Sequence, residues 1–361
     1  MRRALTLLLL CAGSQALAAL PGSTRLSPAL PSSTLPRAVT PITGIRHEYQ
    51  RLNNCGPVTI GMAMSRWGGT QNQYVTAPEL KPTKSDKNVG PGELAEYAQA
   101  QGYGVYSGVN GDLPLMKRLL AAGFPVIVET WFVTGEEGGM GHYRLLTGYD
   151  DAKRQFSALD SYYGPKVRMD YNDFARLWRG YHGTFLVVYP GGRKAQLDSV
   201  EGIDTQRNQP MWSGALANAE ASLSNRPGDA LALYNLGAAK LRLGDARGAA
   251  RAFAQAEAAA PDPLLDPTRP ARVSGGLPWR FLWYRFEILE AYLRVGRNAD
   301  VLRITAEVLR DAPDHEEAHS WRGRALAALG RTAQARGELQ AALRLRPGFA
   351  AARVALDRLG N

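Results

Sequence analysis

A glutamine and a cysteine stand five positions apart in the stretch YQRLNNCGPVTIGMAMSRWGG (residues 49–69), where a helix is predicted to begin. The neighbouring Asn-Asn and Gly are turn and cap residues, and Pro57 fits the first helical turn, where its missing N–H costs nothing. The unpaired N–H groups at the start of a helix favour negative charge, so they lower the pKa of a thiol placed there. Because the thiolate is the nucleophilic form, Cys55 is a candidate nucleophile.

The start of the chain determines how many cysteines remain. Residues 1–18 have the pattern of a secretory signal peptide, with a basic start, a short apolar run and a small-residue cleavage site. Its removal takes away Cys11, the only other cysteine, so Cys55 has no partner for an internal disulfide. We therefore expect an exported protein that is secreted, periplasmic or held at the cell surface. The cysteine count alone leaves a buried structural thiol and a reactive thiol equally open.

A cysteine nucleophile needs a base, and the chain has five histidines. His142 begins a predicted strand directly after the glycine-rich loop GEEGGMG, where a side chain can face a cleft. Asp160 ends the next predicted strand, so a hairpin would bring its carboxylate to the imidazole and hold the tautomer of the ring. A solvated or capping role for His142 is the alternative interpretation. The other histidines are His182 at the start of the last predicted strand, His47, which would have to fold back, and His315 and His319 in a helical region.

Acyl transfer also needs hydrogen-bond donors for the oxyanion of its intermediate. The backbone N–H of Cys55 is one candidate. The side-chain amide of Gln50, on the approach to the predicted helix, is the second, because a carboxamide donates N–H groups without competing for the proton of the base. The four groups that a thioester mechanism needs are therefore present.

Mixed helical and strand patterns surround these residues. Predicted helices span 55–67, 91–101 and 113–123, the last of them capped by Asp112. Predicted strands span 124–131, 142–150, 155–160 and 184–190. Helices that precede a mainly antiparallel set of strands indicate an α+β domain over residues 45–190. The Pro-, Ser- and Thr-rich residues 19–44 are predicted to be an extended tether, and residues 191–211 a second linker.

The C-terminal part of the chain is repetitive. Pro227, Pro261, Pro313 and Pro347 follow one another at intervals of 34, 52 and 34 residues. A 34-residue period of helix hairpins resembles the tetratricopeptide repeat, and a Pro- and Gly-rich insertion at 262–278 explains the longer interval. We therefore expect an all-α tetratricopeptide repeat solenoid over residues 212–361, with half a hairpin at 212–227, three full repeats and a final capping helix. Such stacks usually present a concave surface to a peptide or protein partner.

Composition excludes several classes of function. The formal net charge is +10, but the basic residues form no run or stripe, which argues against nucleic-acid binding. After the predicted signal peptide, no stretch is long and apolar enough to span a membrane. The histidines are scattered and Cys55 has no second thiol near it in sequence, so we expect no metal site and no cofactor.

The blocks YQRLNNCGPVTIGMAMSRWGG and GHYRLLTGYD…ALDSYYGP together resemble the bacteriocin-processing cysteine peptidases, family thirty-nine of this class, within the papain-like superfamily. The resemblance covers about residues 45–190 and implies a papain-like fold. It also implies Cys55 as nucleophile, His142 as general base and acid, Asp160 as its orienter and Gln50 in the oxyanion hole.

The chain departs from the best-known members of that family in three respects. They are fused to a membrane exporter and cleave leader peptides after paired glycines, so that leader specificity does not carry over. The interval between Gln50 and Cys55 is one residue shorter than in well-studied relatives, and Ser161 stands where relatives often have proline.

These observations predict an exported cysteine peptidase that hydrolyses peptide or amide bonds, with helical repeats that recruit the substrate or a protein partner. Two alternatives stay open at this point. In the first alternative, the papain-like domain is a catalytically silent module in a protein-binding scaffold. In the second, the same thioester passes its acyl group to an amine, and the protein is an acyl transferase.

Overall fold

The computed structural model describes residues 35–83, 88–135, 138–203 and 208–360. The predicted signal peptide and residues 19–34 of the predicted tether lie outside the described residues. Residues 35–361 form one compact unit. In it, a sheet with its helices comes first along the chain, and a region of helices alone follows.

A seven-stranded antiparallel sheet is the centre of the first domain over the described residues. The order across the sheet is β2 (Gly104–Gly108), β7 (Phe185–Tyr189), β3 (Val126–Thr134), β4 (Gly138–Asp150), β5 (Gln155–Asp160) and β6 (Gly164–Asp170), and the short β1 (Ala38–Val39) pairs with β4. Strands β3, β4 and β5 form one continuous meander, so residues far apart in sequence come to lie side by side.

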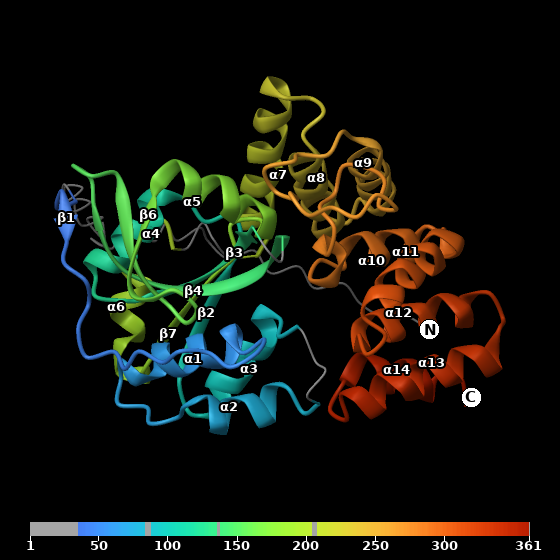
Figure 1. The fold of residues 1–361 in the computed structure, drawn as a ribbon, viewed down its shortest axis with the longest axis horizontal. Coiled ribbons are helices and arrows are strands. Elements are labelled where there is room, and N and C mark those ends of the chain that lie inside the picture. Colours follow the sequence, from blue (N-terminus) through green and yellow to red (C-terminus); the bar gives the residue numbers. More distant parts are fainter. Residues whose placement is uncertain (1–34, 84–87, 136–137, 204–207, 361) are drawn as a thin grey trace, which may run out of the picture. The chain divides into compact units, whose positions relative to one another are not determined.

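Helices cover both faces of this sheet (Figure 1). On one face lie α1 (Cys55–Ser65), α2 (Gln73–Leu80) and α3 (Pro91–Ala100), and on the other α4 (Leu113–Ala121) and α5 (Tyr171–Trp178). The alternation of a strand explains the two cores, since Ile127 packs with α1 and α3 whereas Val128 packs with α4 and α5. Nearly all of α1 is buried, which suits its mainly apolar sequence.

Both predicted linkers contact the sheet domain where they are described. Residues 35–44 run along β4, where β1 pairs with it and the Ile42 N–H donates to the Thr147 carbonyl, so the predicted tether does not extend to residue 44. In the second linker, η2 (Gly191–Arg193) and α6 (Lys194–Asp198) are helical, and Leu197, Val200 and Ile203 are buried against α4. Apolar side chains within these segments account for both corrections.

The remaining helices form consecutive antiparallel pairs. They are α7 (Asn208–Asn225), α8 (Ala230–Arg242), α9 (Ala246–Ala258), α10 (Glu287–Arg294), α11 (Asn298–Asp311), α12 (Glu316–Ala328), α13 (Thr332–Leu345) and α14 (Ala350–Asp357), with the short turns η1 (Arg179–Tyr181) and η4 (Phe281–Trp283). Gly244, Gly296 and Gly330 follow α8, α10 and α12 at positive φ, which glycine adopts without strain. They produce the same sharp turn in each hairpin.

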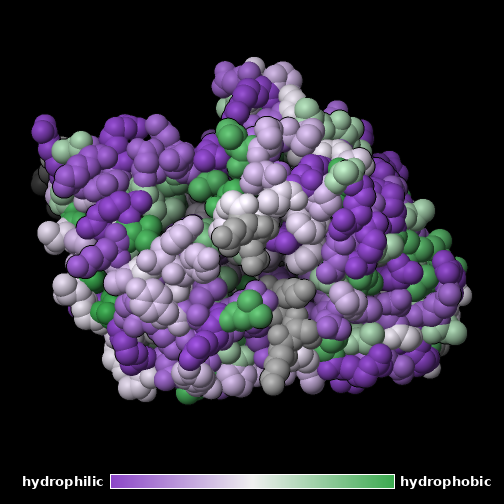
Figure 2. Space-filling view, viewed as in Figure 1, coloured by the Kyte–Doolittle hydropathy of each residue, from purple (hydrophilic) through white to green (hydrophobic). Residues whose placement is uncertain are grey.

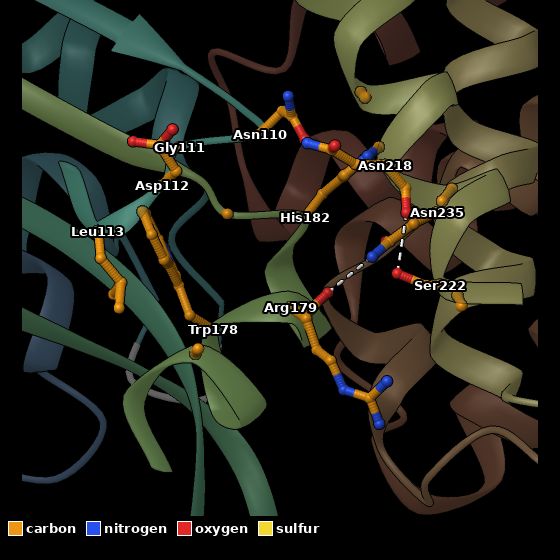
Figure 3. Close-up of a pocket in the computed structure, with 15 residues that line it drawn as sticks. Asn110, Gly111, Asp112, Leu113, Trp178, Arg179, His182, Asn218, Ser222 and Asn235 are labelled. Carbon is orange, nitrogen blue, oxygen red and sulfur yellow. Dashed lines mark hydrogen bonds between the residues drawn. The ribbon is translucent and has the colours of Figure 1, made fainter. Parts of the chain in front are cut away.

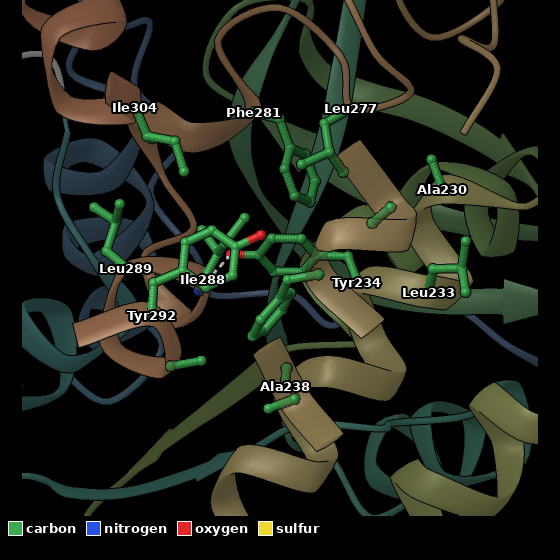
Figure 4. Packing of buried hydrophobic residues seen from close by; sticks show 14 of the residues in the cluster. Ala230, Leu233, Tyr234, Ala238, Leu277, Phe281, Ile288, Leu289, Tyr292 and Ile304 are labelled. Carbon is green, nitrogen blue, oxygen red and sulfur yellow. Dashed lines mark hydrogen bonds between the residues drawn. The ribbon is translucent and has the colours of Figure 1, made fainter. Parts of the chain in front are cut away.

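The core of the helical region extends into the sheet domain. Figure 4 shows Tyr234 of α8 packed beside Phe281 and Leu277, with Ile288 and Tyr292 of α10 close by. Trp131 of β3 and Tyr181 of η1 belong to the same buried cluster. The predicted fold class, an α+β domain followed by all-α repeats, is confirmed.

The surface differs from these cores in character. The face in Figure 2 is mostly hydrophilic, with hydrophobic residues in small separate groups. Among the described residues, no helix combines the length and the hydrophobicity that a membrane crossing requires.

Candidate active site

Cys55 is the first residue of α1 and is partly buried. The turn before it is fixed by α2, because the side-chain oxygen of Gln73 accepts hydrogen bonds from the Arg51 N–H at 2.7 Å and from the Asn54 amide at 3.1 Å. Lys81 donates to the carbonyl of Asn53, which has a positive φ. The thiol is therefore held at the start of a helix, with part of its surface accessible.

His142 and Asp160 meet across neighbouring strands. His142 lies in β4 and Asp160 ends β5, and the ring Nε2 donates to Asp160 Oδ1 at 3.0 Å. Both side chains are buried, with His142 3% and Asp160 0% exposed. Oδ1 also accepts the backbone N–H groups of Tyr162 at 2.7 Å and Tyr163 at 3.0 Å. The carboxylate is thereby fixed in one orientation toward the ring.

Arg144 is a member of this site that the sequence reasoning did not include. It is the cross-strand partner of Asp160 in the sheet, and its Nε donates to Asp160 Oδ2 at 2.7 Å. Another nitrogen of the guanidinium donates to the Thr130 hydroxyl. The signal in the sequence was an arginine two positions after the histidine, on the same face of an otherwise apolar strand.

The charges around Asp160 keep it ionised. Burial alone would raise the pKa of this carboxyl group, but the hydrogen bond from His142 and the charges of His142 and Arg144 hold the pKa well below its ordinary value. Asp160 is therefore an anion throughout the neutral range.

The Cys55 thiol and the His142 imidazole shift each other's pKa toward the values that favour an ion pair. Burial opposes charge on Cys55, yet hydrogen bonding with His142, its positive charge and the N–H groups of Tyr143 and Gly56 lower the pKa of the thiol. Burial likewise opposes charge on His142, yet the hydrogen bonds with Asp160 and Cys55 raise the pKa of the imidazole. Both shifts favour thiolate and imidazolium together.

The stacking around His142 limits how the ring can turn. Phe132 of β3 lies 4.6 Å from the imidazole, centroid to centroid, at 32° between the ring planes. The Arg144 guanidinium lies 5.2 Å from the centroid of the same phenyl ring. The imidazole is therefore supported on one face while its Nε2 is held by Asp160.

Gln50 reaches the site through Ser161. The Gln50 N–H donates to the Ser161 carbonyl at 2.9 Å, and the Ser161 hydroxyl donates to Gln50 Oε1 at 2.7 Å. The second bond fixes which way the amide group is turned, because the oxygen is used and the NH₂ end remains to donate elsewhere. The sequence showed Ser161 only as a departure from the proline of relatives, and its contact with Gln50 could not be predicted from that.

The other histidines make different contacts from those of His142. His47 Nε2 donates to the backbone carbonyl of Asp160 at 3.0 Å. His182 lines a pocket with Trp178 and Asn235 where α7 and α8 meet the first domain (Figure 3). Burial and the charge of Arg285 lower the pKa of His182 to about 3. The imidazole whose hydrogen bond and charge lower the pKa of Cys55 is that of His142.

One cluster has side chains of the metal-binding types. His315, Glu316 and Glu317 bring potential ligand atoms within 4.8 Å of one another at the start of α12. Both ring nitrogens of His315 are already engaged, since Nε2 donates to the Trp283 carbonyl at 2.9 Å and Nδ1 accepts the Ala318 N–H at 3.4 Å. The cluster therefore serves as a helix cap, and we assign no metal ion to it.

Comparison with known proteins gives a family for the first domain. The model of the Peptidase_C39 like family matches residues 40–185. Among curated proteins, none matches the chain.

Several solved structures are similar to parts of the chain. A double glycine motif protease from an AMS/PCAT transporter, in complex with a leader peptide, has 15% identity and a TM-score of 0.32 over 42% of this chain and 94% of its own. A putative C39-like peptidase from Bacillus anthracis has 14% identity and a TM-score of 0.34 over 41% and 96%. The protein MamA has 15% identity and a TM-score of 0.33 over 43% and 81%.

The family model covers all four predicted site residues, and the helix pairs after the sheet repeat at the spacing found in the sequence. Residues 40–185 are therefore similar to the Peptidase_C39 like family, and they are followed in this chain by a helical region of the tetratricopeptide type.

Proposed function

We propose that the protein is a cysteine peptidase that hydrolyses peptide or amide bonds through a thioester on Cys55. The observation that carries the proposal is the position of His142, which is hydrogen-bonded to the buried Asp160 and electrostatically coupled to the Cys55 thiol at the start of α1. This is the arrangement that nucleophilic catalysis by a thiol requires.

The proposed first step is attack on the carbonyl carbon of the substrate. The Cys55 thiolate forms a carbon–sulfur bond while the carbonyl electrons move to oxygen. The backbone N–H of Cys55, which is in the first helical turn and has no intrahelical partner, and the amide NH₂ of Gln50 donate to that oxyanion. The oxyanion then collapses and the carbon–nitrogen bond breaks, which leaves the thioester on Cys55. The leaving amine takes its proton from Nδ1 of His142, since Nε2 is bonded to Asp160.

The second step releases the acyl group. His142 accepts a proton from water, the resulting hydroxide forms a bond to the thioester carbonyl, and the carbon–sulfur bond breaks to restore the thiolate. Asp160 and Arg144 act through the imidazole, because the ionised carboxylate holds the ring in one tautomer and stabilises its charged form.

The surroundings of the site favour a peptide substrate with apolar side chains. Four large hydrophobic residues next to the site residues in sequence are exposed, namely Tyr49, Leu52, Tyr162 and Tyr163. Tyr162 and Tyr163 pack edge-on against Phe132, which in turn supports His142. The helical repeats would recruit the substrate or a partner protein, and export remains a prediction from residues 1–18.

Hydrolysis of a fluorogenic peptide library by the full chain tests the proposal. Cys55→Ser and His142→Ala should each abolish turnover. His182→Ala is the matched control, because it removes the other candidate base from a buried position, and it should retain activity. A folded wild-type chain that turns over no peptide or amide would contradict the proposal and favour the silent binding module. Acyl products formed only with an added amine would favour the transferase.

A further inference from the structure

The helical region contributes a buried segment to the peptidase domain. Residues 259–286, between α9 and α10, form this inserted segment. The indole N–H of Trp131 in β3 donates to the Leu265 carbonyl at 2.6 Å, and Arg285 donates to the Gly180 carbonyl at 2.7 Å. All three side chains, Trp131, Leu265 and Arg285, are buried. The sheet domain and the inserted segment therefore share a core and do not meet only at a surface contact.

Tyr284 of the inserted segment lies against the strand that carries His142. A Cβ atom added to Gly141 would stand 3.1 Å from the ring of Tyr284 and would collide with the hydroxyl of Tyr181. The ring centroids of Tyr284 and Trp131 are 6.4 Å apart, and those of Tyr284 and Tyr181 6.1 Å apart. Strand β4 therefore lacks a side chain where this tyrosine packs, immediately before His142.

Tyr284 is also within the electrostatic reach of the nucleophile. Burial and then the charge of the Cys55 thiolate raise the pKa of the Tyr284 hydroxyl, and the same two causes are among those that raise the pKa of Tyr181. Tyr284 is only partly buried.

We propose that Tyr284 forms a wall of the peptidase active site, so that the repeat region determines which substrates reach Cys55. The inference rests on the proposed function and deepens it. The wall stands beside Gly141 and His142, and it excludes acyl donors that are bulky on that side. The active site of this protein is thus built from both parts of the chain, and Tyr284 is a specificity-determining residue.

Alkylation of Cys55 in the full chain tests the wall without any substrate. Iodoacetamide and its fluorescein derivative share one chemistry and differ in bulk. Tyr284→Ala should raise the rate ratio of the bulky to the small reagent by about tenfold or more, since about tenfold is the lower end of the discrimination that one methylene exerts in a pocket. Tyr284→Phe should leave the ratio unchanged, because it keeps the ring. Trp283→Ala is the matched control, since Trp283 lines a hollow within the repeats.

An unchanged ratio in folded Tyr284→Ala would overturn the inference. If that variant does not fold, Tyr284→Leu, which keeps an apolar contact with Trp131, must show a rise in the same direction, and no rise there would overturn it too. The proposed function fails separately. A raised ratio in a protein that hydrolyses nothing supports the wall but refutes the peptidase, whereas hydrolysis with an unchanged ratio does the reverse.

Discussion

The helical repeats and the candidate active site differ in how far apart in sequence their contacting residues lie. In the repeats, each helix packs mainly on the next one along the chain, as α8 does on α9 and α12 on α13. In the candidate active site, Cys55 interacts with His142, which lies 87 positions later, and His142 is hydrogen-bonded to Asp160 of the neighbouring strand. We therefore expect the repeats to tolerate local changes, whereas the site depends on one register of the sheet.

The largest effect should come from Asp160→Asn. It leaves Arg144 buried without its ionic partner, which costs about 3 to 5 kcal/mol in the free energy of unfolding. Turnover should fall by about 10²- to 10⁴-fold, because the imidazole loses its orienting charge. Denaturant unfolding and peptide hydrolysis measure the two effects.

Asp150→Asn is the matched control for that change. Asp150 caps the hairpin turn between β4 and β5, and its partner Lys153 is exposed. Equal losses in the two variants would show that any carboxylate of this hairpin matters equally, which contradicts a special role for Asp160.

A smaller effect should come from Ser161→Ala. The variant loses the hydrogen bond that orients Gln50, and kcat should fall by about tenfold, which corresponds to about 1.4 kcal/mol. The pH dependence of Cys55 alkylation should stay unchanged, because Ser161 does not contact the imidazole. Ser161→Thr should restore the rate, and a loss of thiol reactivity in Ser161→Ala would count against the assignment of Gln50 to the oxyanion.

The smallest effect should come from the repeats. Gly244 has a φ of +93° and open space around it, so Gly244→Ala introduces only backbone strain, about 1 to 2 kcal/mol. Thermal unfolding measures this loss, and Gly228→Ala, also in open space, is the control that should show none. A change in the alkylation rate of Cys55 in Gly244→Ala would show that a local change in the repeats reaches the candidate site, which contradicts the difference expected between the two regions.

Much of the fold could be predicted because its signals are local. Strand β5 matches the predicted residues 155–160, and α4 begins after the predicted cap, where Asp112 accepts the Leu115 N–H. Strand β6 was missed because it is a mostly exposed edge strand that contains Pro165. Helix α2 was missed because Pro78 lies inside it.

The candidate site was only partly accessible to sequence reasoning. The pairing of His142 with Asp160 could be predicted, since a hairpin joins neighbouring strands. The roles of Arg144 and Ser161 depend on side-chain geometry that no spacing rule supplies. The contact of Tyr284 with Gly141 depends on how an insertion in the repeats packs on a distant strand, which no local pattern encodes.

The pH profile of iodoacetamide alkylation tests whether His142 keeps the Cys55 sulfur anionic. The lowered thiol pKa and the raised imidazole pKa both favour the ion pair, so alkylation of the wild-type protein should persist to a lower pH than that of an ordinary thiol. His142→Ala should move the midpoint toward the value of an ordinary thiol, about 8.5. Profiles that coincide for the two proteins would contradict the account.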